Sequence, residues 1–112
     1  MGNRQERKHR RFHLECQVHV KFQAANSVAE VETVSKNVSI GGLLVHSALV
    51  IPEHTPVTFI MCVRGEQAVH PVYLAGEGKI ARAESNGAGF AIAIKCTIPI
   101  TDLENCLPEA SM

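Results

Sequence analysis

The stretch FHLECQVHVKF, residues 12–22, decides the fold class of this chain. Apolar and polar residues alternate along it without a break. The apolar residues share one parity: Phe12, Leu14, Cys16, Val18, Val20 and Phe22. Successive side chains of a β-strand point to opposite faces, whereas a helix would spread these residues around its whole circumference. The stretch therefore predicts one long strand with a dry face and a wet face.

Five further strands are expected downstream, because Val- and Ile-rich stretches alternate with turn residues. Their ranges are 28–40, 41–47, 57–65, 72–85 and 88–96. Gly76 and Gly78 are expected to let the fifth strand bend or bulge, and Asn86–Gly87 predicts a hairpin before the sixth. A short C-terminal helix is predicted near residues 101–107, with Leu103 facing the barrel. Six short strands with one-sided patterning predict an all-β fold, an antiparallel barrel or sandwich.

Charge is distributed unevenly along the chain. Residues 1–11 hold five of the eleven Lys and Arg residues but only one of the eleven acids, Glu6, so they carry a net charge of +4 and residues 12–112 carry −4. The 112 residues therefore predict one domain, residues 12–112, preceded by a flexible basic arm, residues 1–11. From charge alone, the arm either meets an anion or docks weakly on its own acidic body.

Composition excludes a membrane-spanning or disulfide-rich protein. Apolar residues make up 46% of the chain and charged residues 20%, which is ordinary for a soluble globular domain. No apolar run approaches the ~18–20 residues of a membrane span and no signal peptide is recognised, so a cytoplasmic protein is expected. The four cysteines lack the close spacing of a zinc site, so no metal or cofactor is expected. They are interpreted as free thiols in a reducing compartment: Cys16, Cys62, Cys96 and Cys106.

The stretch NVSIGG, residues 37–42, combines small polar side chains with two glycines. Asn37 and Ser39 lie two residues apart, so on a strand both point to one face. Gly41 and Gly42 follow, and they allow a ligand or a neighbouring backbone to approach closely. Alone, the pattern is a weak signal for a site and is more typical of a strand that ends in a bulge or a tight turn.

The order of these features resembles the PilZ domain family. An R-x-x-x-R arm is followed by a long alternating strand and, after the next strand, by N-x-S-x-x-G. The second motif of the family begins with Asp or Asn, which this sequence satisfies. The resemblance covers residues 4–107 and rests on five positions: Arg7, Arg11, Asn37, Ser39 and Gly42.

PilZ domains are six-stranded antiparallel β-barrels that bind the bacterial second messenger cyclic di-GMP. The resemblance implies the same barrel here, with the R-x-x-x-R arm wrapped across the ligand and the N-x-S-x-x-G strand as its floor. Lys8, Arg10 and Gly41 are expected to be auxiliary ligand contacts. Such a receptor needs no cofactor besides its ligand, and we expect it to signal by ordering its arm into a surface for a downstream protein. Family members that bind two stacked ligands often have Arg where this chain has Glu6, so one ligand per protein is expected.

The residue types also suit this ligand on chemical grounds. Guanine O6 and N7 are adjacent acceptors that a guanidinium fork matches, and guanidinium groups also stack on bases and pair with phosphates. Lysine cannot do all three, so Arg7 and Arg11 are not expected to tolerate Lys. Asn37 and Ser39 can hydrogen-bond a guanine edge or phosphate oxygens, and Gly42 would leave room for the purine.

Other functions fit the sequence less well. A nucleic-acid-binding barrel of the OB or SH3-like type would share the architecture and the basic arm. However, all four Phe residues fall on apolar parities and the acidic body repels a polyanion. A PilZ-like interaction module that binds no ligand would not need both motifs intact. An enzyme is not expected, because the histidines and the carboxylates of Glu30 and Glu32 are interpreted as solvated and no catalytic residue can be argued.

Overall fold

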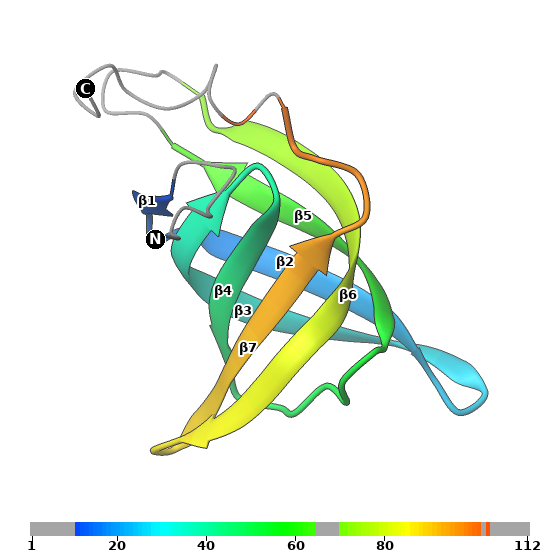
Figure 1. The fold of residues 1–112 in the computed structure, drawn as a ribbon. Helices are drawn as coiled ribbons and strands as arrows, with labels where there is room; N and C mark the ends of the chain where they lie inside the picture. Colours follow the sequence, from blue (N-terminus) through cyan, green and yellow to red (C-terminus); the bar gives the residue numbers. More distant parts are fainter. Residues whose placement is uncertain (1–10, 65–69, 102, 104–112) are drawn as a thin grey trace, which may run out of the picture.

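A computed structural model describes residues 11–64, 70–101 and 103 of the chain. Seven strands lie within these ranges, and all of their pairings are antiparallel (Figure 1). They are β1 (Phe12–His13), β2 (Gln17–Ala24), β3 (Ser27–Ser39), β4 (Gly42–Ser47), β5 (Pro56–Val63), β6 (Val72–Asn86) and β7 (Gly89–Cys96). No helix in this part of the chain is long and apolar enough to cross a membrane. The all-β class predicted from the alternation is confirmed.

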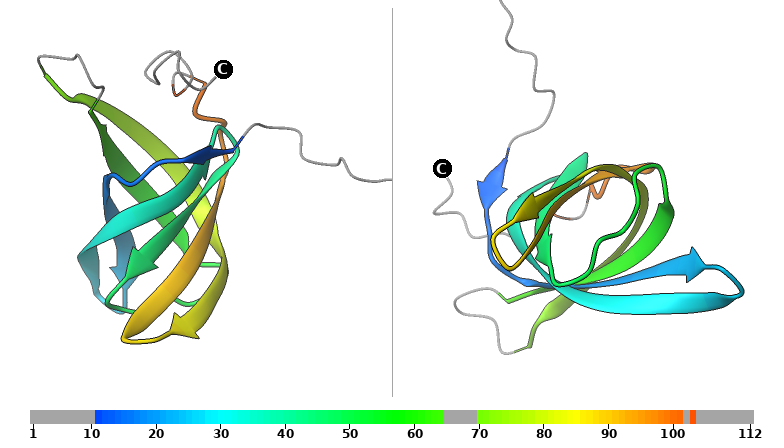
Figure 2. Two further views of the ribbon diagram at one scale, coloured as in Figure 1. Left: turned by 90° about the vertical axis from the view of Figure 1, so that its left-hand side faces the viewer. Right: turned by 90° about the horizontal axis from the view of Figure 1, so that it is seen from below.

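Six of the strands close into a barrel. The hydrogen-bonded order is β3-β2-β5-β6-β7-β4, and β4 pairs back with β3. The N-terminal part of β3 pairs with β2, its C-terminal part pairs with β4, and β1 adds two residues opposite Asn37 and Val38. The end-on view in Figure 2 shows the closed ring, with the β2–β3 hairpin extending beyond it. The predicted six-stranded antiparallel barrel is therefore confirmed, with β1 as one additional short strand.

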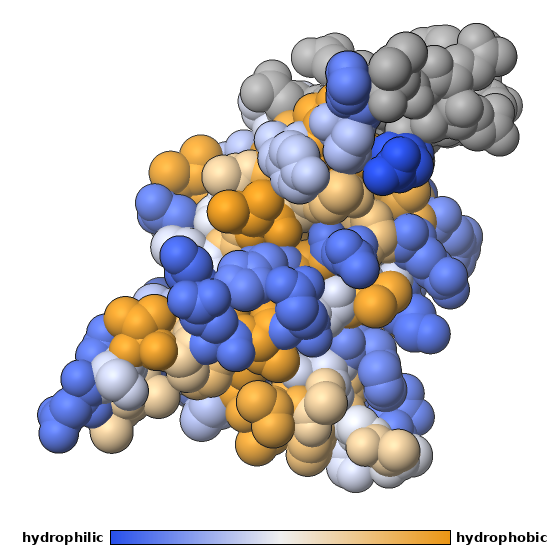
Figure 3. Space-filling view, turned by 180° about the vertical axis from the view of Figure 1, so that it is seen from behind, coloured by the Kyte–Doolittle hydropathy of each residue, from blue (hydrophilic) through white to orange (hydrophobic). Residues whose placement is uncertain are grey.

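The inward faces of the strands form one hydrophobic core. It is built mainly from Val, Ile and Leu side chains around Phe59 and Met61. Three further Phe side chains are partly buried and pack against it: Phe12, Phe22 and Phe90. Seen from behind, the barrel surface shows apolar patches separated by hydrophilic side chains (Figure 3). Of the five aromatic residues, only Tyr73 is largely exposed (65%), so the aromatic residues serve the core as their parity predicts.

The strand predicted over residues 12–22 is interrupted between β1 and β2. His13 pairs with Asn37 and Gln17 pairs with Val34. Three residues on the first strand therefore face two on β3, which is the geometry of a β-bulge. The prediction of one continuous strand is wrong here, because strict alternation in the sequence does not reveal an extra residue in the ladder.

The side chain of Ser35 holds this interruption together. Ser35 is fully buried. Its hydroxyl donates to the carbonyl oxygen of Leu14 and accepts a hydrogen bond from the N–H of Cys16 (3.0 Å). The N–H of Ser35 in turn donates to the carbonyl oxygen of Cys16 (2.9 Å). One buried hydroxyl thus pairs backbone groups that the broken ladder would leave without partners, and it fixes β1 beside the C-terminal part of β3.

The bulge of β6 does not lie at Gly76 or Gly78, where a bend or bulge was expected. The pairing with β5 runs without a shift through both residues, and the bulge of β6 lies instead between Ile80 and Arg82. A Cβ on Gly76 would lie 2.4 Å from the ring of Phe59, and a Cβ on Gly78 would lie 2.4 Å from the carbonyl oxygen of Lys95. The two glycines are needed for close packing.

The hairpin predicted at Asn86–Gly87 is confirmed. Asn86 pairs with Gly89, so Gly87 and Ala88 form a two-residue loop. Gly87 has a φ of 64°, in the left-handed region that favours glycine. The loop therefore uses the residue type that a tight hairpin requires.

The segment after β7 packs against the β3–β4 turn at one end of the barrel. The N–H of Ile100 donates to the carbonyl oxygen of Ile40 (2.7 Å), and the N–H of Cys96 donates to that of Gly41 (2.9 Å). Ile100 and Leu103 are buried in the core, as expected for Leu103. The helix predicted near residues 101–107 otherwise lies outside the described residues.

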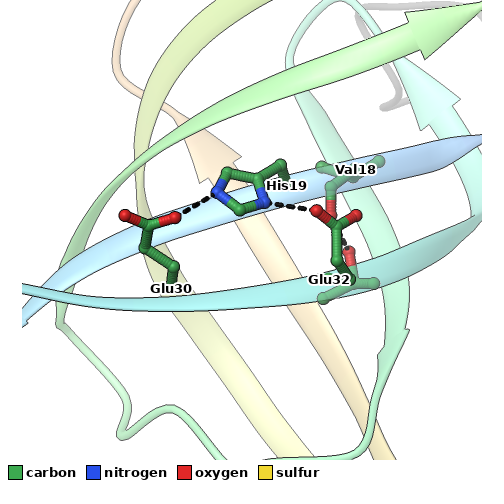
Figure 4. Close-up of polar contacts among 5 residues, drawn as sticks. Val18, His19, Glu30 and Glu32 are labelled. Atoms are coloured by element: carbon green, nitrogen blue, oxygen red, sulfur yellow. Dashed lines mark hydrogen bonds and ion pairs between the residues drawn. The ribbon is translucent and has the colours of Figure 1, made fainter.

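A charge cluster lies on the outer face of β2 and β3 (Figure 4). Nε2 of His19 lies 2.8 Å from a carboxylate oxygen of Glu30, and Nδ1 of His19 hydrogen-bonds the carboxylate of Glu32. Because a carboxylate faces each ring nitrogen, the doubly protonated imidazolium satisfies both contacts. The hydrogen bonds to Glu32 and then Glu30 raise the pKa of His19 above its ordinary value. These side chains, interpreted from the sequence as separately solvated, form one cluster.

Replacing Ser35 should destabilise the barrel markedly. Ser35→Ala leaves backbone groups of Leu14 and Cys16 without their side-chain partner, which should cost about 1–3 kcal/mol of unfolding free energy. Urea denaturation measures the loss. Ser85→Ala, at an exposed position, serves as the control and should change the free energy by less than about 0.5 kcal/mol. An equally small change for Ser35→Ala would contradict the bridging role.

The pKa of His19 should depend on its two acidic neighbours. Because the folded-state pKa is raised, the ion pairs stabilise the fold fully below the ordinary value of 6.5, and this contribution is lost as pH rises through the raised value. NMR titration of the imidazole should show a raised pKa that falls in Glu32→Gln and, less, in Glu30→Gln. Glu84→Gln, on β6, should leave it unchanged. An unshifted pKa in the wild type would exclude the cluster.

Candidate functional site

A cleft of about 350 Å³ lies on the outer surface of β3, β4, β7 and β6, and we call it the β3–β6 cleft. Its lining includes five of the residues that the sequence singles out: Arg11, Asn37, Ser39, Gly41 and Gly42. The other lining residues are Val38, Leu43, Leu44, Ala81, Arg82, Ala93, Ile94 and Lys95. Three predicted contacts, Arg7, Lys8 and Arg10, lie outside the described residues. The structure thus brings together the predicted residues that it describes.

Two rows of paired residues cross the cleft from β3 to β6. The first row is Asn37, Leu44, Ala93 and Arg82. The second row is Ser39, Gly42, Lys95 and Lys79. In each row the middle positions on β4 and β7 include a small residue, whereas polar or cationic residues stand on β3 and β6. The register therefore creates a low floor between two polar sides.

The bulge in β6 is what places Arg82 on the outer surface. Regular alternation from the inward-facing Ile80 would point Arg82 into the core, but Ala81 is inserted between the paired positions. Arg82 is consequently exposed and Ala83 faces inward. Sequence reasoning missed Arg82, although an arginine on the apolar parity of Leu74 and Ile80 was a signal of this bulge. It also missed Lys95, although Lys95 has the outward parity of the last strand.

Ser39 and Gly42 have roles within the fold itself. The hydroxyl of Ser39 accepts a hydrogen bond from the N–H of Gly41 (3.2 Å) and donates to the carbonyl oxygen of Gly42 (3.3 Å). A Cβ on Gly42 would lie 2.7 Å from the carbonyl oxygen of Ile94, so β4 can approach β7 only with glycine here. The N-x-S-x-x-G pattern is therefore also the signature of this turn.

The electrostatic character of the cleft is cationic. Arg11, Arg82 and Lys95 line it, and none of its described lining residues is Asp or Glu. Glu84 lies beside it and pairs with Nε of Arg82 at 3.4 Å, with both side chains largely exposed. Guanidinium and ammonium groups over a floor of small residues suit an anionic ligand with a flat apolar part.

A second cleft of about 400 Å³ lies across β2, β5 and β6, beside residues 98–100. Its lining is mainly apolar and includes Ile60, Ala75, Ile98 and Pro99. It holds none of the residues of the two motifs. The β3–β6 cleft is therefore the better candidate, because its chemistry matches its sequence motif.

The described part of the chain offers little other reactive chemistry. Within it, no group of three His, Cys, Asp or Glu side chains could hold a metal ion. Burial raises the pKa of Cys96 to about 11 and also raises that of Cys16. These thiols stay protonated near neutral pH, so they act as small apolar side chains and not as nucleophiles.

Comparisons with known proteins bear on the fold. No protein-family model matches the sequence, and no curated protein matches it significantly. The solved structure of the inhibitor of motility MotI/DgrA from Bacillus subtilis matches with a TM-score of 0.72 and 20% identity, over 91% of this chain and 48% of that one. This chain therefore spans about half the length of that protein.

A second solved structure covers both chains more evenly. The PilZ domain of CeSA from a cellulose-synthesizing bacterium matches with a TM-score of 0.54 and 24% identity, over 87% of this chain and 89% of that domain. At these identities the likeness is one of fold. The closed barrel of six antiparallel strands and the similarity to these two structures together show that this chain has a PilZ-like fold.

Proposed function

We propose that this chain is a receptor for cyclic di-GMP, which binds in the β3–β6 cleft. The observation that carries the proposal is the meeting of Arg11, Asn37, Ser39 and the glycines 41–42 at one cationic cleft. The likeness in fold to a PilZ domain and to an inhibitor of motility supports a regulatory binding role and not catalysis. The proposal places the receptor in the cytoplasm of a bacterium.

The ligand chemistry follows from the residue types. Arg11, and Arg7 from the preceding arm, stack on or fork to the guanines and pair with phosphate oxygens. The amide of Asn37 hydrogen-bonds a guanine edge. The hydroxyl of Ser39 has a second lone pair available for a ligand donor, because the turn uses its proton and one lone pair. Ala93 and Gly42 leave room for a purine over β4 and β7.

Signalling in this proposal proceeds through the arm, residues 1–11. The arm closes over the ligand, with Lys8 and Arg10 as auxiliary contacts, and becomes part of a surface that a downstream protein recognises. Binding shifts the population of arm conformations, and the dianionic ligand offsets the entropy lost when the arm becomes ordered. Glu6 disfavours a second, stacked ligand, so the complex contains one cyclic di-GMP per protein.

A second candidate function has a specific observation in its favour. The turn explains Ser39, and the close approach of β4 to β7 explains Gly42, without any ligand. A PilZ-like interaction module that binds no nucleotide would keep both residues for its fold. Arg11 and Asn37 therefore discriminate between the two functions, because the described part of the fold gives these two residues no comparable role.

Replacing the arginines should remove binding without unfolding the barrel. Arg11→Ala and Arg7→Ala should abolish the heat of cyclic di-GMP binding in calorimetry, and Arg11→Lys should fail to restore it. The wild type should bind one ligand. Lys21→Ala, a matched loss of charge on β2 outside the cleft, should bind like the wild type. The melting temperature without ligand should hardly change in any of these variants.

The outcomes separate the alternatives. A dissociation constant of 1 μM corresponds to a binding free energy of about −8 kcal/mol. If the wild type gives no heat of binding at tens of micromolar cyclic di-GMP, the receptor is excluded and the module that binds no ligand is favoured. Single-stranded DNA that outcompetes the dinucleotide would favour a nucleic-acid-binding barrel. A large loss of stability in Arg11→Ala would mean that this residue is structural.

Gly42→Ala should lower the stability of the fold even when no ligand is present. Its Cβ would meet the carbonyl oxygen of Ile94 at 2.7 Å, a backbone contact that cannot shift easily. The substitution should cost about 1–3 kcal/mol of unfolding free energy in urea denaturation without any ligand. Ala93→Gly, on the floor of the same cleft, adds space without a clash and serves as the comparison. Wild-type stability for Gly42→Ala would show that β4 and β7 are less closely packed than here.

A further inference from the structure

The outer face of β6 and β7, at the cleft, carries a pair of like charges that the fold does not explain. Lys79 on β6 and Lys95 on β7 are directly opposite each other in the antiparallel ladder. Like charges at such positions destabilise a sheet. Neither lysine forms an ion pair with any residue in the described ranges, and Arg82 adds a third cation on the same outer face.

Two of these three cations line the cleft, on the side away from the arm. Arg82 and Lys95 belong to its lining and Lys79 does not. Arg82 stands opposite Ala93, and Lys95 follows two residues later on the same face of β7, so the two cations are diagonal neighbours. We call Arg82 and Lys95 the far rim of the cleft.

The far rim lies at a useful distance from the motif residues. Three strand spacings of about 4.8 Å separate β3 from β6, so Asn37 and Arg82 stand about 14 Å apart along the curved surface. The two residues between them, Leu44 and Ala93, carry no charge. Long Arg and Lys side chains can lean over this floor from the far rim while Arg11 approaches from the other side.

We propose that Arg82 and Lys95 bind the second phosphate of a dinucleotide whose first phosphate is held by Arg11. This inference rests on the proposed function, which assigns the cleft to cyclic di-GMP. A cyclic dinucleotide carries two phosphates on opposite sides of its ring, so a single ligand across β4 and β7 presents one phosphate to each side. The far rim thus makes the cleft selective for ligands with two separated phosphates and relieves the repulsion between Lys79 and Lys95.

Glu84 is the group that the ligand displaces from Arg82. The two side chains are 62% and 64% exposed and their closest atoms lie 3.4 Å apart, so the ion pair is weak and easily exchanged. A phosphate offers the guanidinium a bidentate and stronger partner. Glu84→Gln should therefore tighten cyclic di-GMP binding, by about 1.5- to 5-fold.

Calorimetry with cyclic di-GMP on matched variants tests the inference. Lys95→Gln and Arg82→Gln should weaken binding about tenfold or more, because each removes a charged hydrogen-bond donor to phosphate. Lys79→Gln removes the same charge from the same cross-strand pair but outside the lining, and should change affinity less than about threefold. Without ligand, both lysine variants should melt about 1–5 °C higher than the wild type, because either one relieves the repulsion.

The results distinguish this inference from the proposed function. Wild-type affinity in both Lys95→Gln and Arg82→Gln would overturn the far rim and leave the receptor intact. Equal losses in all three variants would overturn it too, since they would report a general field and not a contact. No binding by the wild type would overturn both. Loss in Lys95→Gln and Arg82→Gln, with binding kept and stability raised in Lys79→Gln, would support the far rim.

Discussion

Closure of the sheet through β3 is the constraint on which the rest of the structure depends. β3 pairs with β2 along its first part and with β4 along its second, and it accepts β1 where β2 is absent. This change of partner strands along β3 requires an irregular ladder near Ser35. The buried hydroxyl of Ser35 supplies hydrogen-bond partners for the backbone there. Because β1 lies opposite Asn37, the pairing of β1 with β3 also brings Arg11, the last residue of the basic arm, to the cleft.

The sequence predicted the barrel well, because its information lies in alternation. The parity of residues 12–22 and the hairpin at Asn86–Gly87 depend on local geometry that every strand shares. The failures are the places where a ladder gains a residue. The bulge before Gln17 leaves no trace in the hydropathy pattern, because it is defined by a partner strand. The bulge at Ala81 leaves only one sign, an arginine at position 82 on the apolar parity of Ile80. The packing role of Gly76 was missed for a similar reason, since it depends on the ring of Phe59, the residue paired with it on β5.

The candidate site was predictable to the extent that it follows from motifs. Arg11, Asn37 and Ser39 stand together as their spacing suggested, although their contact with a ligand stays a prediction. Arg82 was missed, because the β6 bulge that turns it outward was not inferred from its place on the apolar parity of Ile80. Gly42 shows a different limit of motif-based prediction. The motif indicated that glycine is needed there for a ligand, whereas in the structure the close backbone of Ile94 also requires glycine at this position. A motif can mark a turn and a binding site at the same time.

In the proposed function, charge is the reason why an arm of this composition needs an anion to close. The acids at Glu30 and Glu32 lie on the outer face of β2 and β3, where His19 already pairs with them. Residues 1–11 carry a net charge of +4, and the last of them, Arg11, lines the same cleft as Arg82 and Lys95. Closure of the arm over an empty cleft brings cations together, and the cost falls with distance and with salt. Under the proposed function, a ligand with two phosphates reverses the sign of that interaction on both sides of the cleft, so the same charges that oppose closure without it favour closure with it.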